Sequence, residues 1–260
     1  MWVNHTISTQ QRFDAVIDPL AQTGGYHWSH VANLASILKR SLMSRNSVIE
    51  QGLKFSDPSI QTIQTRRSTL EVYIGGSTIH DYANLLWHPR NAGTFRVIKE
   101  NGIGNVVIAE YDAAVQNLPG AVATHRWAPD VLPYRLSSQG QILSERKLHS
   151  DMYAERFPGW DLRSWYSDET DEFGNRIKNS LKSSFLQAEL LIPKQIPSDY
   201  ISRLYVGTEE AAHDVLAILR RAADSGWVPH TIAIIVCEDL FFAYRPGASY
   251  FKPNALNNTE

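Results

Sequence analysis

The stretch from residue 184 to 193 carries one acidic side chain, Glu189, in a largely apolar run: Ser-Phe-Leu-Gln-Ala-Glu-Leu-Leu-Ile-Pro. Residues two apart on a strand point to the same face. Glu189 is therefore expected to face a cleft together with Gln187, with Ala188 and Leu190 in the core. A carboxylate on such a strand is costly unless it is paired or faces a cleft, the alternative being a strand-edge Glu in water. A cleft carboxylate can stabilise a developing cation or accept a proton.

Polar and aromatic residues gather at the ends of the other expected strands. Each alone is more often an ordinary core or surface residue. Together they offer an acid/base group, a hydroxyl-binding group and a fork for phosphate. The set comprises Tyr26, His27, Ser29, Asn33, Arg66, Arg67, His80, Asp81, Tyr82, Asn84, Trp87, His125, Arg126, Trp127, Gln187 and Glu189.

Other chemistries find little support in the sequence. His27 and His30 fit no H-E-x-x-H spacing and have no carboxylate cluster beside them, so no metal site is expected. The glycine pairs at 24–25 and 102–104 make neither a G-x-G-x-x-G nor a Walker loop. Cys237, the single cysteine, ends an apolar run, which favours a buried thiol over a nucleophile and excludes an intramolecular disulfide.

The elements that must position these residues are short helices and short strands. Helices and strands follow one another without a regular βαβ alternation, which predicts an α+β fold. Residues 128–180 show no clean period, as in a functional loop region or irregular helices. Expected strands cover residues 26–30, 70–74, 81–87, 105–111, 122–125, 184–193, 201–207 and 230–236, and expected helices cover residues 31–42, 59–67, 94–101 and 209–225.

The bulk composition is that of a folded globular protein. The chain has 260 residues, 43% of them hydrophobic, and 25 Lys and Arg against 27 Asp and Glu. One domain over residues 1–260 is expected, with residues 1–23 as a peripheral extension. The net charge of −2 excludes a globally basic nucleic-acid coat but allows a local basic groove. No apolar run approaches the ~20 residues of a membrane span, and no signal peptide is recognisable, so a cytoplasmic protein is expected.

Four blocks, in order, resemble the DarT toxins, which are DNA ADP-ribosyltransferases. The first, residues 26–38, reads Tyr-His-Trp-Ser-His-Val-Ala-Asn-Leu-Ala-Ser-Ile-Leu, and the second, residues 63–67, ends in Arg-Arg. The third, residues 75–91, contains Asp-Tyr-Ala-Asn-Leu-Leu-Trp-His-Pro-Arg, and the fourth, residues 187–193, reads Gln-Ala-Glu-Leu-Leu-Ile-Pro. The similarity extends over roughly residues 24 to 240.

This resemblance implies a fold and an activity. The fold would be an ADP-ribosyltransferase-like split, twisted β-sheet core with peripheral helices, binding NAD as co-substrate and no metal. The activity would be transfer of ADP-ribose from NAD onto thymine or guanine of single-stranded DNA, by the toxin of a toxin–antitoxin pair whose antitoxin is of the macrodomain type. The alternatives are an enzyme that modifies RNA or protein, and a catalytically silent module that binds NAD or nucleic acid.

The resemblance also implies residue roles. Cleavage of the nicotinamide–ribose bond passes through an oxocarbenium-like state, which a nearby carboxylate stabilises. An Arg would contact the NAD phosphates and the reaction centre, and two adjacent Arg residues are candidates. The implied catalytic residues are Glu189 with Arg67 or Arg66, and the implied NAD-binding residues are His27, Ser29, Asn33, Asp81, Tyr82 and Gln187.

A DNA-binding strip is expected beside the cleft, because a target base must be displaced or single-stranded. Its candidates are His125, Arg126, Trp127 and Arg90. Near residues 124–128 the family commonly has an Asp and then a His before the Ala, whereas this chain has His125 and Trp127. Either of the two could take the family's His position, so the choice between thymine and guanine stays open.

Overall fold

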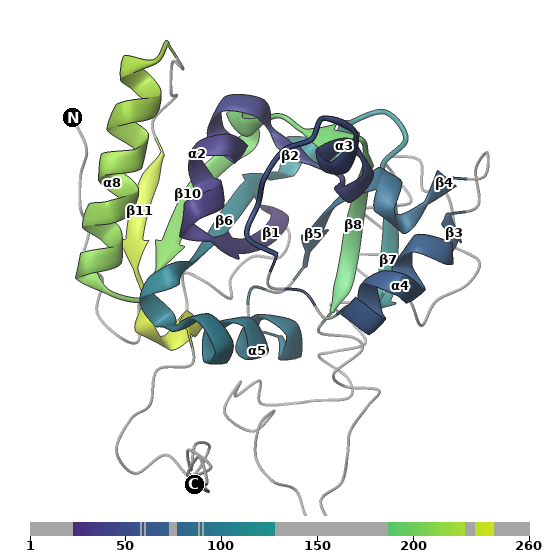
Figure 1. The fold of residues 1–260 in the computed structure, drawn as a ribbon, viewed down its shortest axis with the longest axis horizontal. Helices are drawn as coiled ribbons and strands as arrows, with labels where there is room; N and C mark the ends of the chain where they lie inside the picture. The colour runs from purple at the N-terminus through teal and green to yellow at the C-terminus, as the bar shows by residue number, and fades with distance from the viewer. Residues whose placement is uncertain are drawn as a thin grey trace, which may run out of the picture.

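The computed structural model describes residues 23–57, 59, 61–72, 77–87, 89, 91–127, 187–226 and 232–241. Their centre is a seven-stranded mixed sheet (Figure 1). All neighbouring strands are antiparallel except the parallel pair at one edge. The strand order is β11 (Ala233–Val236), β10 (Ile201–Val206), β6 (Val106–Asp112), β1 (Thr23–His30), β5 (Tyr82–Leu86), β8 (Ala188–Pro193) and β7 (Val122–Trp127).

Helices cover both faces of the sheet because the strands are apolar on both. The larger core lies under α2 (Val31–Arg40) and α8 (Glu209–Asp224), which pack against each other over one face (Figure 1). A second core lies under α5 (Ala92–Asn101). Ala188 and Leu190 of β8 are both fully buried in the first core, as their alternation predicts.

The helix α8 connects the parallel strands β10 and β11, which need such a crossover. Thr208 caps its first turn by accepting a hydrogen bond from the Ala211 amide. Glu209 and Glu210 follow, where acidic side chains favour the positive end of the helix dipole. The expected helix over 209–225 is thereby confirmed to within one residue.

The sheet is split between β1 and β5. The strand β1 pairs with β6 from Thr23 to His30, but it meets β5 only at Tyr26, opposite Leu86. Beyond that pair the two strands diverge. The half made of β11, β10, β6 and β1 therefore separates from the half made of β5, β8 and β7, and a cleft opens between them.

Short elements surround this split. They include the helices α3 (Arg45–Glu50) and α4 (Gln61–Thr69) and two small sheets. The small sheets pair β2 (Leu42–Met43) with β9 (Gln195–Ile196), and β3 (Glu71–Val72) with β4 (Ser77–Thr78). Single 3-10 turns cover Ile79–Asp81, Ile103–Asn105, Ala113–Asn117, Ser198–Tyr200 and Glu238–Phe241.

Two local expectations were wrong, and one helix was not expected. The helix α2, expected over residues 31–42, ends at Arg40, because Ser41 takes a left-handed φ of 89° and Leu42 enters β2. The helix α3 was not among the expected helices; it buries none of its residues and so lacks an apolar stripe. Asp81 ends a 3-10 turn and does not begin the following strand.

The α+β fold with a split sheet is confirmed. No helix in the described part of the chain is long and apolar enough to cross a membrane. Residues 1–22 and the weakly patterned segment 128–180 lie outside the described residues, so the peripheral extension and the single-domain organisation stay predictions.

Candidate active site

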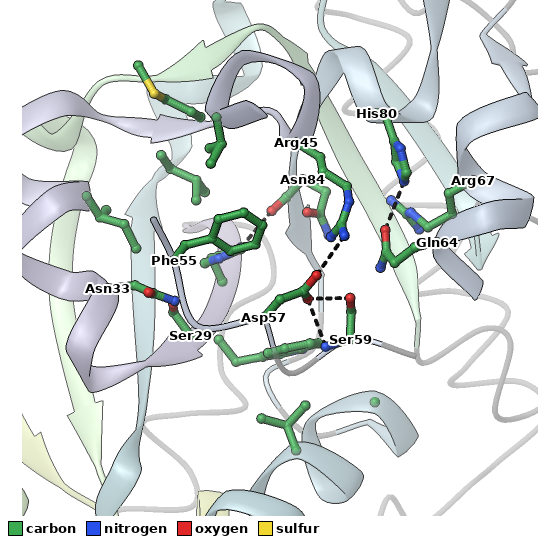
Figure 2. A pocket seen from close by; sticks show the side chains of 18 of the residues that line it. Ser29, Asn33, Arg45, Phe55, Asp57, Ser59, Gln64, Arg67, His80 and Asn84 are labelled. Atoms are coloured by element: carbon green, nitrogen blue, oxygen red, sulfur yellow. Dashed lines mark hydrogen bonds and ion pairs between the residues drawn. The ribbon is translucent and has the colours of Figure 1, made fainter. Parts of the chain in front are cut away.

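A cleft of about 290 Å³ lies where the sheet splits. Its wall comes from β1, α2, α3, α4, β5, α5, β8 and the segment 53–57, which are far apart in the sequence. Figure 2 shows how several of these side chains converge on one space. Of the predicted site residues, His27, Ser29, Asn33, Arg67, Tyr82, Gln187 and Glu189 line this cleft.

The centre of the site is an ion pair between Glu189 and Arg67. The guanidinium donates from Nη1 to Oε1 and from Nη2 to Oε2, each at 2.8 Å. Glu189 is 1% exposed and Arg67 8% exposed. A bidentate pair of this kind fixes both the position and the plane of the carboxylate. The strand-edge alternative, with Glu189 facing water, is therefore excluded.

The direction of the helix α4 turns Arg67, and not Arg66, toward the cleft. Arg67 is buried and lines the cleft, whereas Arg66 is exposed and is not part of the cleft wall. Neighbours on a helix point about 100° apart, so both cannot face the same carboxylate. Arg67 is the arginine that reaches Glu189.

His27 bridges the split in the sheet. Its Nδ1 lies 3.1 Å from the backbone oxygen of Asn84 on β5. A carbonyl oxygen only accepts, so Nδ1 carries the proton. Burial lowers the pKa of His27 to about 4, and the hydrogen bond to Asn84 opposes this only in part. The ring is therefore neutral at pH 7, which leaves Nε2 as an acceptor.

Asn33 fixes the loop that forms one side of the cleft. Its side-chain amide donates to the Ser56 oxygen at 2.9 Å and accepts from the Ser56 amide at 2.8 Å. The same nitrogen donates to Ser29 Oγ at 3.1 Å. Asn33 thus joins the helix α2, the end of β1 and the segment 53–57.

A second ion pair, which was not expected, joins the helix α3 to this loop at the cleft wall. Arg45 Nη2 lies 2.7 Å from Asp57 Oδ2, and the same guanidinium lies 5.7 Å from the centre of the Phe55 ring (Figure 2). Burial raises the pKa of Asp57, but hydrogen bonds from Arg45 and from Ser59 outweigh it and lower that pKa overall. Phe55 is 41% exposed, so part of its ring is open to a ligand.

His80 also lines the cleft, beside Gln64 of α4. Its Nε2 lies 2.9 Å from Gln64 Oε1. Burial, with smaller contributions from the positive charges of Arg45 and Arg67, lowers the pKa of His80 to about 4. His80 belonged to the polar group noted in the sequence, but it was not assigned a role there.

Asp81 was predicted to bind NAD, and its carboxylate makes structural hydrogen bonds to Asn46 and Thr78. Its carboxylate accepts from Asn46 Nδ2 at 2.7 Å and from the Thr78 amide at 2.7 Å. These bonds lower the pKa of Asp81, against the opposing effect of burial. Asp81 is absent from the cleft wall and ties α3 to the turn before β5. Its neighbour Tyr82 does line the wall.

Gln187 lies in the turn just before β8 and lines the cleft with Glu189, as their shared parity predicts. It approaches the first turn of α5, where Gln187 Oε1 would lie 3.7 Å from a Cβ at Gly93. Asn91 caps that turn by accepting from the amides of Gly93 and Thr94.

The predicted DNA strip can be placed only in part. His125, Arg126 and Trp127 lie at the end of β7, next to Glu189 on β8, but their side chains are outside the described part of the structure. Arg90 lies outside the described residues altogether. Within the described ranges, no group of three or more His, Cys, Asp or Glu side chains is placed to hold a metal ion.

Comparison with known proteins finds a family match that contains all four sequence blocks. A model of the DarT family, described as ssDNA thymidine ADP-ribosyltransferase, matches residues 26–242. A DNA ADP-ribosyl transferase–DNA ADP-ribosyl glycohydrolase fusion protein of Thermosipho africanus is 22% identical over 209 residues, covering 78% of this chain and 46% of the relative. The chain thus spans about half the length of that curated relative.

Solved structures show the same fold. Thermus sp. 2.9 DarT in complex with ADP-ribosylated ssDNA is 19% identical, with a TM-score of 0.63, over 83% of this chain and 94% of that one. The same protein in complex with NAD+ is 21% identical, with a TM-score of 0.58, over 83% and 95%. Since the family model covers most of the 260 residues, the resemblance is confirmed and the chain belongs to the DarT family.

Proposed function

We propose that this protein transfers ADP-ribose from NAD onto a nucleobase of single-stranded DNA, with thymine as the first base to test. The observation that carries the proposal is the buried Glu189 carboxylate, held by Arg67 at the wall of the cleft where the sheet splits. The description of the family, which names single-stranded DNA and thymidine, supports the acceptor. Guanine remains the second base to test.

Transfer of ADP-ribose from NAD requires one carboxylate near the ribose that carries nicotinamide. The bond between the nicotinamide nitrogen and ribose C1′ breaks, nicotinamide leaves with the bonding electrons, and positive charge develops on the ribose. A base nitrogen then attacks C1′ and releases its proton to a carboxylate or to water. A carboxylate fixed beside C1′ stabilises the oxocarbenium-like state and is placed to accept that proton.

The chain's own groups fit these tasks. Arg67 holds both oxygens of the Glu189 carboxylate and so fixes its plane at the cleft wall, where the carboxylate would face the ribose. The neutral His27 offers Nε2 as an acceptor to a hydroxyl or amide of the NAD molecule. Ser29, Asn33, Tyr82 and Gln187 complete the proposed NAD-binding wall.

The solved relatives support both substrates. Thermus sp. 2.9 DarT was determined in complex with NAD+ and in complex with ADP-ribosylated ssDNA. The Thermosipho africanus relative joins a transferase to a DNA ADP-ribosyl glycohydrolase in one chain. That fusion supports the proposal that this protein is a toxin whose partner, a macrodomain-type antitoxin, removes the modification. A cytoplasmic location, where NAD and DNA meet, belongs to the same proposal.

Mass spectrometry of oligonucleotides tests this directly. The purified protein is incubated with NAD and with each of four single-stranded homo-oligonucleotides, beside a duplex, an RNA and a protein extract. We expect one ADP-ribosyl group on a single-stranded DNA substrate, and none with Glu189→Ala. Label on RNA or protein alone would move the acceptor to the alternative class. Consumption of no NAD by the wild-type protein would contradict an enzymatic role altogether.

A further inference from the structure

The backbone of Glu189 has an unusual partner on the neighbouring strand. On the side of β5, the Trp87 amide donates to the Ala188 oxygen at 3.0 Å. In an antiparallel ladder, hydrogen-bonded and non-hydrogen-bonded pairs alternate. Because Trp87 and Ala188 form a hydrogen-bonded pair, the next pair, Leu86 with Glu189, does not. The N–H and C=O groups of Glu189 therefore point away from β5 and toward β7.

The ladder with β7 is interrupted where these groups point. Ala123 pairs with Leu190, but the next pair is Trp127 with Ala188, so β7 has extra residues opposite Glu189. Such a bulge removes the regular backbone pairing at that place. Here the Thr124 hydroxyl contacts the Glu189 backbone: Oγ1 accepts from the Glu189 amide at 2.9 Å and donates to the Glu189 oxygen at 3.3 Å. Thr124 is 1% exposed, so water does not replace it.

We propose that Thr124 is a positioning residue for the Glu189 carboxylate. Arg67 holds the end of the side chain, and the Thr124 hydroxyl holds its backbone. A carboxylate fixed at both ends keeps its place while charge develops on a nearby ribose, which is what preorganised stabilisation requires. The Thr124 hydroxyl thus ties the Glu189 backbone to β7 at the bulge. The inference rests on the proposed function, because it assigns Thr124 to the same reaction.

Substitutions at Thr124 separate a positioning role from a merely structural one. Thr124→Val keeps the shape and removes the hydroxyl, whereas Thr124→Ser keeps the hydroxyl. Steady-state ADP-ribosyl transfer is measured for both, with thermal unfolding. We expect Thr124→Val to lower kcat about 10- to 100-fold with the KM for NAD within about twofold, because Thr124 supports another residue's alignment. We expect Thr124→Ser to restore kcat to within about threefold of wild type.

The matched control is Ser198→Ala. Ser198 Oγ donates to the Leu38 oxygen at 2.8 Å and is buried away from the cleft wall. We expect this variant to lower the unfolding temperature without lowering kcat. If Thr124→Val does not fold, Thr124→Cys decides, because a thiol is a weaker donor and acceptor. Its kcat should then lie about 3- to 10-fold below that of wild type.

The outcomes distinguish the two proposals. A wild-type protein that transfers no ADP-ribose overturns the proposed function, and this inference with it. If the wild type is active and a folded Thr124→Val has an unchanged kcat, the inference alone is overturned. The same holds for an unchanged kcat in Thr124→Cys, where Thr124→Val does not fold. Failure of Thr124→Ser to restore kcat overturns it too, because the hydroxyl would not be the group that matters.

Discussion

Arg67 and Glu189 lie 122 positions apart in the sequence, and their side chains meet in two parallel hydrogen bonds of 2.8 Å each. The pair joins the helix α4 to the strand β8 at the wall of the cleft. Both side chains are buried, so removing one partner takes two hydrogen bonds and the opposite charge away from the other.

Replacing the Arg67 guanidinium by another cation should lower kcat even though the positive charge is kept. Arg67→Lys leaves one ammonium, which cannot span both oxygens of Glu189 as a guanidinium does. We expect kcat to fall about 100-fold, since misplacement of a catalytic group by 1 Å has an effect of that order. Arg67→Ala should also lower the free energy of unfolding by about 3–5 kcal/mol. Steady-state kinetics and urea denaturation measure the two effects.

The adjacent arginine provides the control. Arg66→Lys changes an exposed residue outside the cleft wall, and its free energy of unfolding should stay within about 0.5 kcal/mol of wild type. Its kcat should be unchanged as well. If Arg66→Lys impaired kcat as much as Arg67→Lys, the assignment of Arg67 as the residue that acts on Glu189 would be wrong.

Stability should decrease in mild acid because of His27. Burial lowers its pKa to about 4 in the folded protein, whereas an unfolded His titrates near 6.5. The unfolded chain therefore binds a proton at higher pH than the folded protein. The contribution of His27 to the free energy of unfolding is complete above about pH 6.5 and is lost as the pH falls toward 4. The total loss is on the order of 3 kcal/mol.

Urea midpoints at pH 7.0, 5.5 and 4.5 measure this loss. His27→Asn keeps a donor for the Asn84 oxygen and removes the titrating ring. The slope of the free energy of unfolding against pH should therefore fall by about half. His80, whose pKa is likewise lowered to about 4, also contributes to the pH dependence. An unchanged slope in His27→Asn would show that its ring does not titrate as described.

The parts of the fold that were predicted from the sequence are those with a local pattern. The alternation in 188–193 identifies a strand and its core face, and the apolar spacing in α8 identifies a helix. The helix α3 has no buried residue, so its sequence carries no apolar periodicity that would predict a helix. The end of α2 depends on the left-handed Ser41 and on pairing of Leu42 with Ile196, which lies far along the chain.

The site was predicted as a set of residue types, but its contacts were not. Adjacent arginines in α4 are equivalent in the sequence, and only the packing against β8 selects Arg67. The pair of Arg45 with Asp57 forms across a loop and leaves no periodic signal. The hydroxyl of Thr124 matters because of a shift in strand register, which no local pattern reveals.

The loop that Asn33 holds should control NAD affinity. Asn33→Ala removes two hydrogen bonds to the Ser56 backbone, so the segment 53–57 loses its connection to α2. We expect the KM for NAD to rise about 5- to 10-fold with a smaller change in kcat. The free energy of unfolding should fall by about 1–2 kcal/mol. Asn105→Ala, which removes an exposed bond to the Asn101 oxygen, should leave both kinetic constants unchanged.

The start of β1 should tolerate no side chain at residue 24. A Cβ on Gly24 would overlap the backbone oxygen of Asp112 and a methyl group of Val115, and neither the β6 backbone nor the buried Val115 can easily move. We expect Gly24→Ala to be destabilised by about 3 kcal/mol, and its melting temperature to fall by roughly 6–12 °C. Gly104→Ala is the matched control, since a Cβ there meets nothing within 4 Å. A Gly24→Ala protein as stable as Gly104→Ala would mean that β1 does not approach β6 this closely, and the position of His27 at the split would have to be revised.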